Sequence, residues 1–69
     1  MRIVRLQQVM DSTGLGRSTI YKYISEDQFP KPLSLGGRSV GWLEAEVLEW
    51  ILARVEERDL ELISGSRIE

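Results

Sequence analysis

Apolar positions recur at helical spacing in three stretches of the chain, and glycine or proline separates them. The first predicted helix begins at Leu6 and ends at Ser12-Thr13-Gly14, where Gly14 is expected in the left-handed conformation. The longest pattern runs from Leu43 to Arg58 and is apolar along one face. Residues 59–69 carry no clear stop signal, so we expect a frayed helix end followed by a mobile acidic tail.

The middle stretch predicts a second helix from Arg17 to near Asp27. Pro30 and Pro32 end it, because proline and the residue before it disfavour helical geometry. Its apolar stripe consists of Ile20, Tyr23 and Ile24. Its opposite face carries Ser18, Tyr21, Lys22 and Ser25.

Two alternating segments flank Gly36-Gly37, a pattern typical of a β-hairpin with a tight glycine turn and Arg38 at its tip. The residues expected to anchor this hairpin on the helices are Leu33, Leu35, Val40 and Trp42. Near the N-terminus, Ile3-Val4 predicts a short strand or an ordered arm. Trp42 and Trp50 are expected in the core.

Together these elements predict a mainly α fold with a small β-hairpin. The order corresponds to a winged helix-turn-helix of three helices plus a two-stranded wing. At 69 residues the chain has room for one domain, which we place at residues 1–58, with the helix end and tail at 59–69.

The net charge of −2 is distributed unevenly along the chain. Residues 1–42 carry six basic and three acidic side chains, a sum of +3, whereas residues 43–69 carry three basic and eight acidic ones, a sum of −5. Electrostatic attraction to phosphate acts over a Debye length of about 8 Å at physiological salt, so a basic face can bind nucleic acid despite an acidic back. An ordinary mixed surface is the alternative interpretation.

The composition excludes several kinds of chemistry. The chain has no cysteine and no histidine, so disulfides, thiolate metal sites and imidazole catalysis are absent, and a cytoplasmic protein is expected. Gly14-x-Gly16 and Gly36-Gly37 are not accompanied by the additional glycine and the lysine that nucleotide-binding loops contain. Carboxylates on a solvated helix face are poorly suited to acid–base catalysis. We therefore expect no enzyme activity, metal or cofactor, and no apolar run spans a membrane.

DNA recognition fits the basic and hydroxyl-bearing residues of the second helix and the hairpin. Arg17 and Lys22 can neutralise phosphates or reach a guanine edge, and Ser18 and Thr19 can hold a phosphate at the helix start. Each has a structural alternative, since the hydroxyls can simply cap the helix, Tyr21 can pack on the wing, and Arg38 can be solvated. The candidate DNA-binding residues are Arg17, Ser18, Thr19, Tyr21, Lys22, Lys31, Arg38 and Ser39.

Over about fifty residues the chain resembles the AlpA-type prophage regulatory proteins, relatives of the MerR-like winged helix and of phage excisionases. The matching segments are Leu15–Tyr21, Phe29–Pro32, Leu35–Trp42 and Glu44–Ile51. The resemblance implies a recognition helix carrying Arg17, Ser18, Thr19, Tyr21 and Lys22, and a wing carrying Arg38 and Ser39. The family usually has serine where this chain has Gly16, so a helix cap is expected to be missing here.

The resemblance implies a sequence-specific DNA-binding transcriptional regulator of a prophage or another mobile element, with its recognition helix in the major groove and a wing contact. An excisionase-like factor that bends DNA and assists an integrase uses the same contacts. A third hypothesis is a protein-interaction module or inhibitor that docks through the acidic C-terminal helix. The expected partners are double-stranded DNA and, in addition, an integrase or a second copy of the chain on DNA, without a membrane. The resemblance implies no small-molecule ligand, because effector sensing of the MerR type needs additional sequence.

Overall fold

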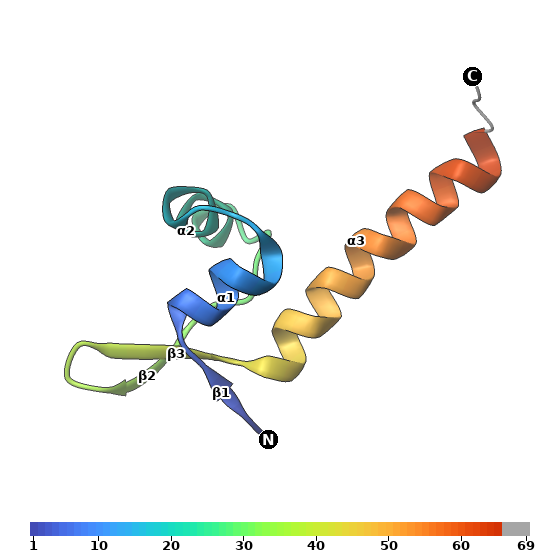
Figure 1. Cartoon of the computed structure of the whole chain (residues 1–69). Helices are drawn as coiled ribbons and strands as arrows, with labels where there is room; N and C mark the ends of the chain where they lie inside the picture. The colour runs from blue at the N-terminus through green and yellow to red at the C-terminus, as the bar shows by residue number, and fades with distance from the viewer. Residues whose placement is uncertain (66–69) are drawn as a thin grey trace.

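A computed structural model describes the backbone of residues 1–65 and the side chains of residues 1–61. Three helices and a small antiparallel sheet form a winged helix-turn-helix (Figure 1). In chain order the elements are β1 (Ile3–Val4), α1 (Leu6–Thr13), α2 (Arg17–Ser25), β2 (Leu33–Gly36), β3 (Ser39–Leu43) and α3 (Glu44–Gly65). A helix end and a mobile acidic tail are expected at residues 59–69; residues 59–65 continue α3, and residues 66–69 lie outside the described residues.

Glycines form the corner between α1 and α2. Gly14 adopts φ +74°, the left-handed conformation predicted for it, and its N–H donates to the carbonyl of Met10 at 2.8 Å. Thr13 stabilises the same corner, since its hydroxyl donates to the Val9 carbonyl and accepts from the N–H of Leu15. These contacts fix the turn that sets α2 against α1.

Helix α2 ends in a Schellman motif two residues before the predicted end near Asp27. The N–H of Gln28 donates to the carbonyl of Tyr23 at 2.8 Å, and the N–H of Asp27 donates to that of Ile24 at 3.1 Å. Asp27 takes the left-handed position of this motif at φ +59°. Aspartate tolerates this conformation better than most side chains.

The three strands pair antiparallel in the order β1-β3-β2, so the predicted hairpin gains a third strand at the N-terminus. Ile3 pairs with Leu43 and Val4 with Trp42. Leu43 therefore belongs to the sheet, and not to the helix in which the pattern placed it, because it is the last residue of β3 and lies opposite Ile3 of β1. The expected short strand at the N-terminus is confirmed.

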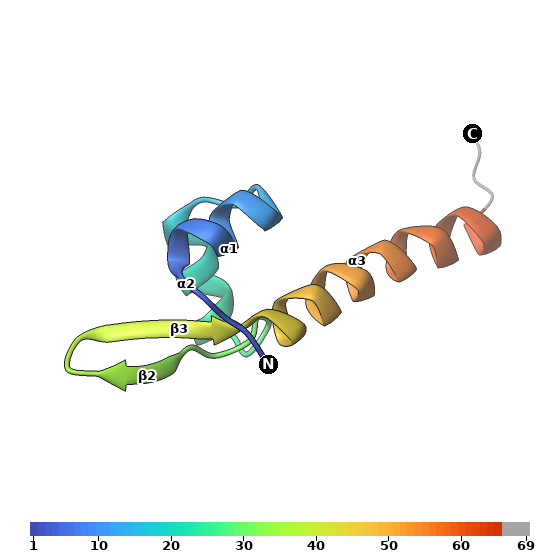
Figure 2. The same ribbon diagram turned by 60° about the horizontal axis from the view of Figure 1, so that its bottom comes forward.

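The hairpin turn lies one residue later than predicted. Gly36 pairs with Ser39, which leaves Gly37 and Arg38 as the two turn residues. Only Gly37 of these two has a positive φ, at +54°, which excludes a type I′ turn. The position of Arg38 at the tip is as expected, and Figure 2 shows the tip extending away from the helices.

Two of the four expected hairpin anchors are wrong. Leu33 and Leu35 are 39% and 44% exposed, whereas Trp42 is fully buried and Val40 is half-buried. The register explains the difference. Val40 and Trp42 face α1 and α2, while Leu33 pairs with Gly41 and so lies on the opposite face of the sheet.

The core draws one residue from almost every element. The buried apolar side chains are those of Val4, Val9, Ile20, Phe29, Trp42 and Val47. Half-buried Tyr23 and Ile24 pack against them, which confirms the stripe predicted for α2. All four residues of β2 are exposed, so β2 reaches the core only through its pairing with β3.

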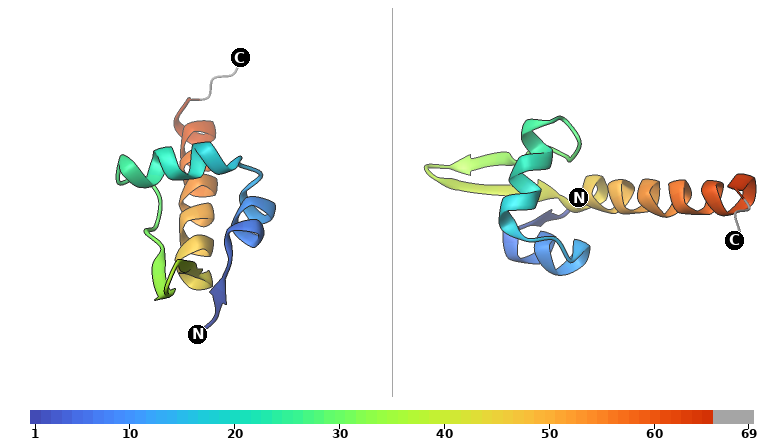
Figure 3. Two further views of the ribbon diagram at one scale, coloured as in Figure 1. Left: turned by 90° about the vertical axis from the view of Figure 1, so that its left-hand side faces the viewer. Right: turned by 90° about the horizontal axis from the view of Figure 1, so that it is seen from above.

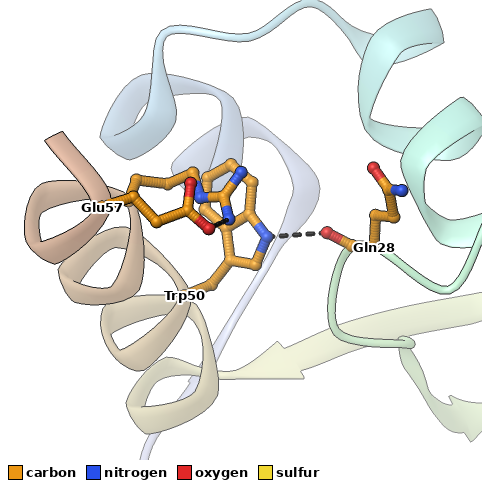
Figure 4. Close-up of polar contacts among 4 residues, drawn as sticks. Gln28, Trp50 and Glu57 are labelled. Carbon is orange, nitrogen blue, oxygen red and sulfur yellow. Dashed lines mark hydrogen bonds and ion pairs between the residues drawn. The ribbon is translucent and has the colours of Figure 1, made fainter. Parts of the chain in front are cut away.

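Helix α3 is longer than the predicted pattern and continues through Gly65. No proline or glycine interrupts it before that residue. Trp50 fastens the helix to the rest of the molecule. Its indole N–H donates to the carbonyl of Gln28 (Figure 4). Its ring lies edge-on to Phe29 with centroids 4.9 Å apart, and the guanidinium of Arg54 lies over it at 5.4 Å. Trp50 is half-buried, at the edge of the core.

The hairpin and α3 project in opposite directions from the body formed by α1 and α2 (Figure 3). This arrangement gives the molecule extents of 50 × 25 × 20 Å. The basic hairpin tip and the acidic end of α3 therefore lie at opposite ends of the long dimension. Among the described residues, no helix is long and apolar enough to cross a membrane.

Candidate nucleic-acid interface

The outward face of α2 presents four of the predicted contact residues together. Arg17, Ser18, Tyr21 and Lys22 are exposed, because Ile20 turns the opposite side of the helix into the core. Thr19 is half-buried, so its hydroxyl is less accessible than that of Ser18. The face combines two cations, a hydroxyl and an aromatic ring, which are the groups that contact phosphates and base edges.

The first turn of α2 has no side-chain cap. Gly16 occupies the N-cap with extended geometry, at φ −78° and ψ 165°, and offers no acceptor oxygen. This confirms the missing cap expected from Gly16. The first N–H groups of a helix point outward along its axis and carry partial positive charge, so an uncapped first turn can bind a phosphate.

Cations without an ion-pair partner define the basic side of the molecule. Within residues 1–61, Arg17, Lys22 and Arg38 form no ion pair. Lys31 differs, because its ammonium lies 3.2 Å from the carboxylate of Asp27. Both side chains of that pair are more than two-thirds exposed, so the contact is weak and Lys31 can exchange it for another anion.

The wing residues sit on the hairpin, where the sequence placed them. Arg38 lies in the two-residue turn and Ser39 begins β3, and both are exposed. Gly36 and Gly37 precede them with φ +110° and +54°, so the tip is narrow on one side of Arg38. A narrow tip with an exposed guanidinium can approach a duplex closely.

Tyr21 joins α2 to the sheet. Its ring lies edge-on to the Trp42 indole, with centroids 6.4 Å apart and an interplanar angle of 63°. Tyr21 nevertheless keeps 38% of its surface exposed. Both interpretations of this residue therefore hold in part, since the ring packs on a wing strand while the side chain still contributes to the outward face.

Sequence reasoning did not single out Arg5, which the structure places at the start of α1. It is exposed and forms no ion pair with the described residues. Its own N–H donates to the side-chain oxygen of Gln8, which fixes the backbone there. In helix-turn-helix proteins the first helix crosses the DNA backbone, so a cation at its start is a further candidate contact. The signal was available in the charge count of residues 1–42.

A shallow groove of about 750 Å³ lies between α3 and the segment that follows α2. Its walls include Phe29, Trp50, Asp27, Glu46 and Glu49. Three carboxylates beside one arginine repel nucleotides and other phosphate ligands. In the described part of the chain, no cluster of acidic side chains has the arrangement of a metal site.

The chain matches a protein-family model described as "Prophage CP4-57 regulatory protein (AlpA)" over residues 2–55. Protein ORF88 of Enterobacteria phage P4 is 46% identical over 57 residues, covering 83% of this chain and 65% of the phage protein. The DNA-binding transcriptional activator AlpA of Escherichia coli K12 is 43% identical over 60 residues, covering 78% of this chain and 86% of that protein.

The family match includes the α1–α2 corner, the outward face of α2, the hairpin and the part of α3 that packs on the core. The chain spans just under two-thirds of the length of the phage P4 protein. With most of its length matched by the family model and with more than 40% identity to both relatives, the chain belongs to the AlpA family of prophage regulatory proteins.

Proposed function

We propose that this chain is a DNA-binding transcriptional regulator of a prophage or a related mobile element, without enzymatic activity. The observation that carries the proposal is the outward face of α2, where Arg17 and Lys22 have no ion-pair partner among residues 1–61 and lie beside an uncapped helix start. The relative from E. coli is named a DNA-binding transcriptional activator and aligns with most of this chain. We assign DNA binding to residues 1–58.

In the proposed complex α2 enters the major groove with its N-terminal residues toward the bases. Arg17 and Lys22 contact phosphate or a guanine edge, Ser18 and the N–H groups of the first turn hold a phosphate, and Arg38 contacts the backbone or the adjacent minor groove. Thr19, Tyr21, Lys31 and Ser39 complete the proposed contact set. The Tyr21–Trp42 contact keeps α2 and the wing at a fixed separation, so both can engage one duplex.

The test is fluorescence anisotropy with a labelled duplex from the upstream region of the protein's own gene, at several salt concentrations, with an unrelated duplex in parallel. Arg17→Ala and Lys22→Ala are each expected to weaken binding about tenfold, which corresponds to about 1.4 kcal/mol. Arg58→Ala is the matched control, since it removes the same charge from the acidic helix, where Arg58 pairs with Asp59.

The proposal fails if the upstream duplex binds no more tightly than the unrelated one. It also fails if the two α2 variants bind like Arg58→Ala, because the cations of α2 would then make no contact. Circular dichroism establishes that each variant is folded before binding is compared. These surface substitutions are expected to change stability by no more than about 0.5 kcal/mol.

A further inference from the structure

The sheet has an apolar outer face that α1 and α2 do not cover. Cross-strand pairing places Ile3 and Leu43, and likewise Leu33 and Gly41, on the same side, opposite the buried side chains of Val4 and Trp42. Leu35 joins them. Its Cδ1 atom and the Cγ2 atom of Ile3 lie 3.1 Å and 2.6 Å from the position that a Cβ of Gly41 would occupy. Ile3, Leu33 and Leu35 are 36–44% exposed.

Helix α3 carries a second exposed apolar surface. Leu48 and Leu52 are 51% and 59% exposed, and their spacing of four places them on one side of the helix, with half-buried Val55 one turn further on. We call these three residues the α3 stripe. Val47 and Trp50 attach another side of the helix to the core, so the body leaves Leu48 and Leu52 of the stripe more than half exposed.

The two apolar surfaces have opposite electrostatic surroundings. The segments that form the sheet and its connections, residues 1–5 and 28–43, contain Arg2, Arg5, Lys31 and Arg38 and no acidic residue. Arg2 and Lys31 pair with Glu44 and Asp27, so within residues 1–61 the unpaired positive charges of these segments are those of Arg5 and Arg38. Residues 44–65 contain seven acidic and two basic residues, a sum of −5. Two copies of α3 placed side by side would repel each other, whereas α3 of one copy attracts the sheet of another.

We propose that the α3 stripe docks on the outer face of the sheet of a second copy of this chain, so that copies associate head to tail. Within one copy the two surfaces cannot meet, because the hairpin and α3 project in opposite directions (Figures 1 and 3). Such an interface is heterologous, so copies joined by it form an open chain, or a ring where the rotation between copies closes. The contact does not require DNA.

Each surface offers only three or four apolar side chains, so the interface is much smaller than the roughly 1,200–2,000 Å² of stable complexes and the association is weak. Sedimentation velocity without DNA, from about 10 µM to about 1 mM protein, covers the affinity expected for such a contact. Wild-type protein is expected to show a mean mass that rises with concentration and falls as salt is added, because salt screens the opposite charges.

Three variants locate the contact. Leu52→Gln disables the stripe, Leu35→Gln disables the sheet, and each protein alone is expected to remain monomeric. An equal mixture of the two retains one intact pair of surfaces, so it is expected to form a species of two chains and nothing larger. Leu60→Gln is the control, since Leu60 is 65% exposed on α3 but lies on a different side from the stripe.

Other outcomes overturn the proposal. Protein that stays monomeric at about 1 mM has no such contact. If Leu52→Gln abolishes association while Leu35→Gln has no effect, two α3 helices pair with each other. If Leu35→Gln abolishes association while Leu52→Gln has no effect, two sheets pair with each other. A mixture of the variants that stays monomeric excludes head-to-tail docking even if each substitution alone is disruptive. Association that strengthens with salt also contradicts the role given to opposite charge.

Discussion

The indole N–H of Trp50 donates a 2.7 Å hydrogen bond to the backbone carbonyl of Gln28, twenty-two residues earlier in the chain. The bond joins α3 to the segment that follows α2. The ring of Trp50 also packs on Phe29, so one side chain contributes both a polar and an apolar contact to the same junction. The attachment of α3 therefore depends strongly on this residue.

Replacing Trp50 separates the two contributions. Trp50→Phe removes the hydrogen bond and keeps an aromatic ring, so we expect a loss of roughly 1 kcal/mol in the free energy of unfolding. Trp50→Ala also removes the packing. A fully buried aromatic costs about 3–5 kcal/mol on truncation, and half-buried Trp50 should fall at or below about 3 kcal/mol. Urea unfolding followed by circular dichroism measures both, and equal losses would show that the ring contributes no packing.

Gly16→Ser is expected to stabilise the protein. The N-cap geometry of Gly16 suits serine, and a Cβ there meets nothing within 4 Å. A capping hydroxyl and reduced freedom of the unfolded chain should together add about 0.5–1 kcal/mol. Gly16→Ala is the control, because it restricts the unfolded chain without supplying an acceptor. A thermal melt in which both variants behave alike would mean that no cap forms.

Gly41→Ala is expected to destabilise the sheet. A Cβ at this position would lie 2.6 Å from Cγ2 of Ile3 and 3.1 Å from the backbone oxygen of Val4, which cannot move aside easily. Crowding of this kind costs roughly 1–3 kcal/mol. The double variant Ile3→Ala/Gly41→Ala removes the closest clash and should lose less stability than the sum of its single variants in urea. If the loss of the double variant equals that sum, contact with the Ile3 side chain is not the source of the strain.

Arg38→Ala tests the wing. If Arg38 contacts DNA phosphate, its removal lowers the magnitude of the slope of log K against log salt by up to about one. The loss should be uniform across sequences for a phosphate contact and biased against one base step for a minor-groove contact. Arg58→Ala, on the opposite end of the molecule, should leave the slope unchanged. If Arg38→Ala binds DNA with the same affinity and the same salt slope as the wild-type protein, Arg38 makes no DNA contact and the wing only stabilises the fold.

The positions of the helices and the outward face of α2 could be predicted from the sequence. The faces of a helix depend on the local periodicity of its apolar residues, and glycine marks where a helix ends. Gly14 ends α1 in the left-handed conformation, and burial of Ile20 alone dictates which side of α2 faces outward. The exposed members of the candidate contact set were therefore recognisable without a structure. Their contact with DNA stays a prediction.

Features that depend on pairing between distant segments could not be predicted. Alternation in Leu33-Ser34-Leu35 marks a strand but does not say which face is buried. Pairing with Gly41 places Leu33 on the outer face, and Cδ1 of Leu35 lies on the same face, beside Gly41. The end of α3 escaped prediction because no glycine or proline marks it before Gly65. The ion pair of Lys31 depends on the left-handed turn at Asp27, which composition does not reveal.

The chain has two tryptophans, and both donate to backbone carbonyls of the short segment after α2, Trp42 to Pro30 and Trp50 to Gln28. Trp42 is inaccessible to solvent, whereas Trp50 is partly open beside the groove. A dissolved cationic quencher such as caesium, which the carboxylates of the groove attract, is expected to reach the second indole and not the first. The intrinsic emission of the unlabelled protein thus contains two separable signals, one that reports the integrity of the sheet and one that reports the seating of the long helix.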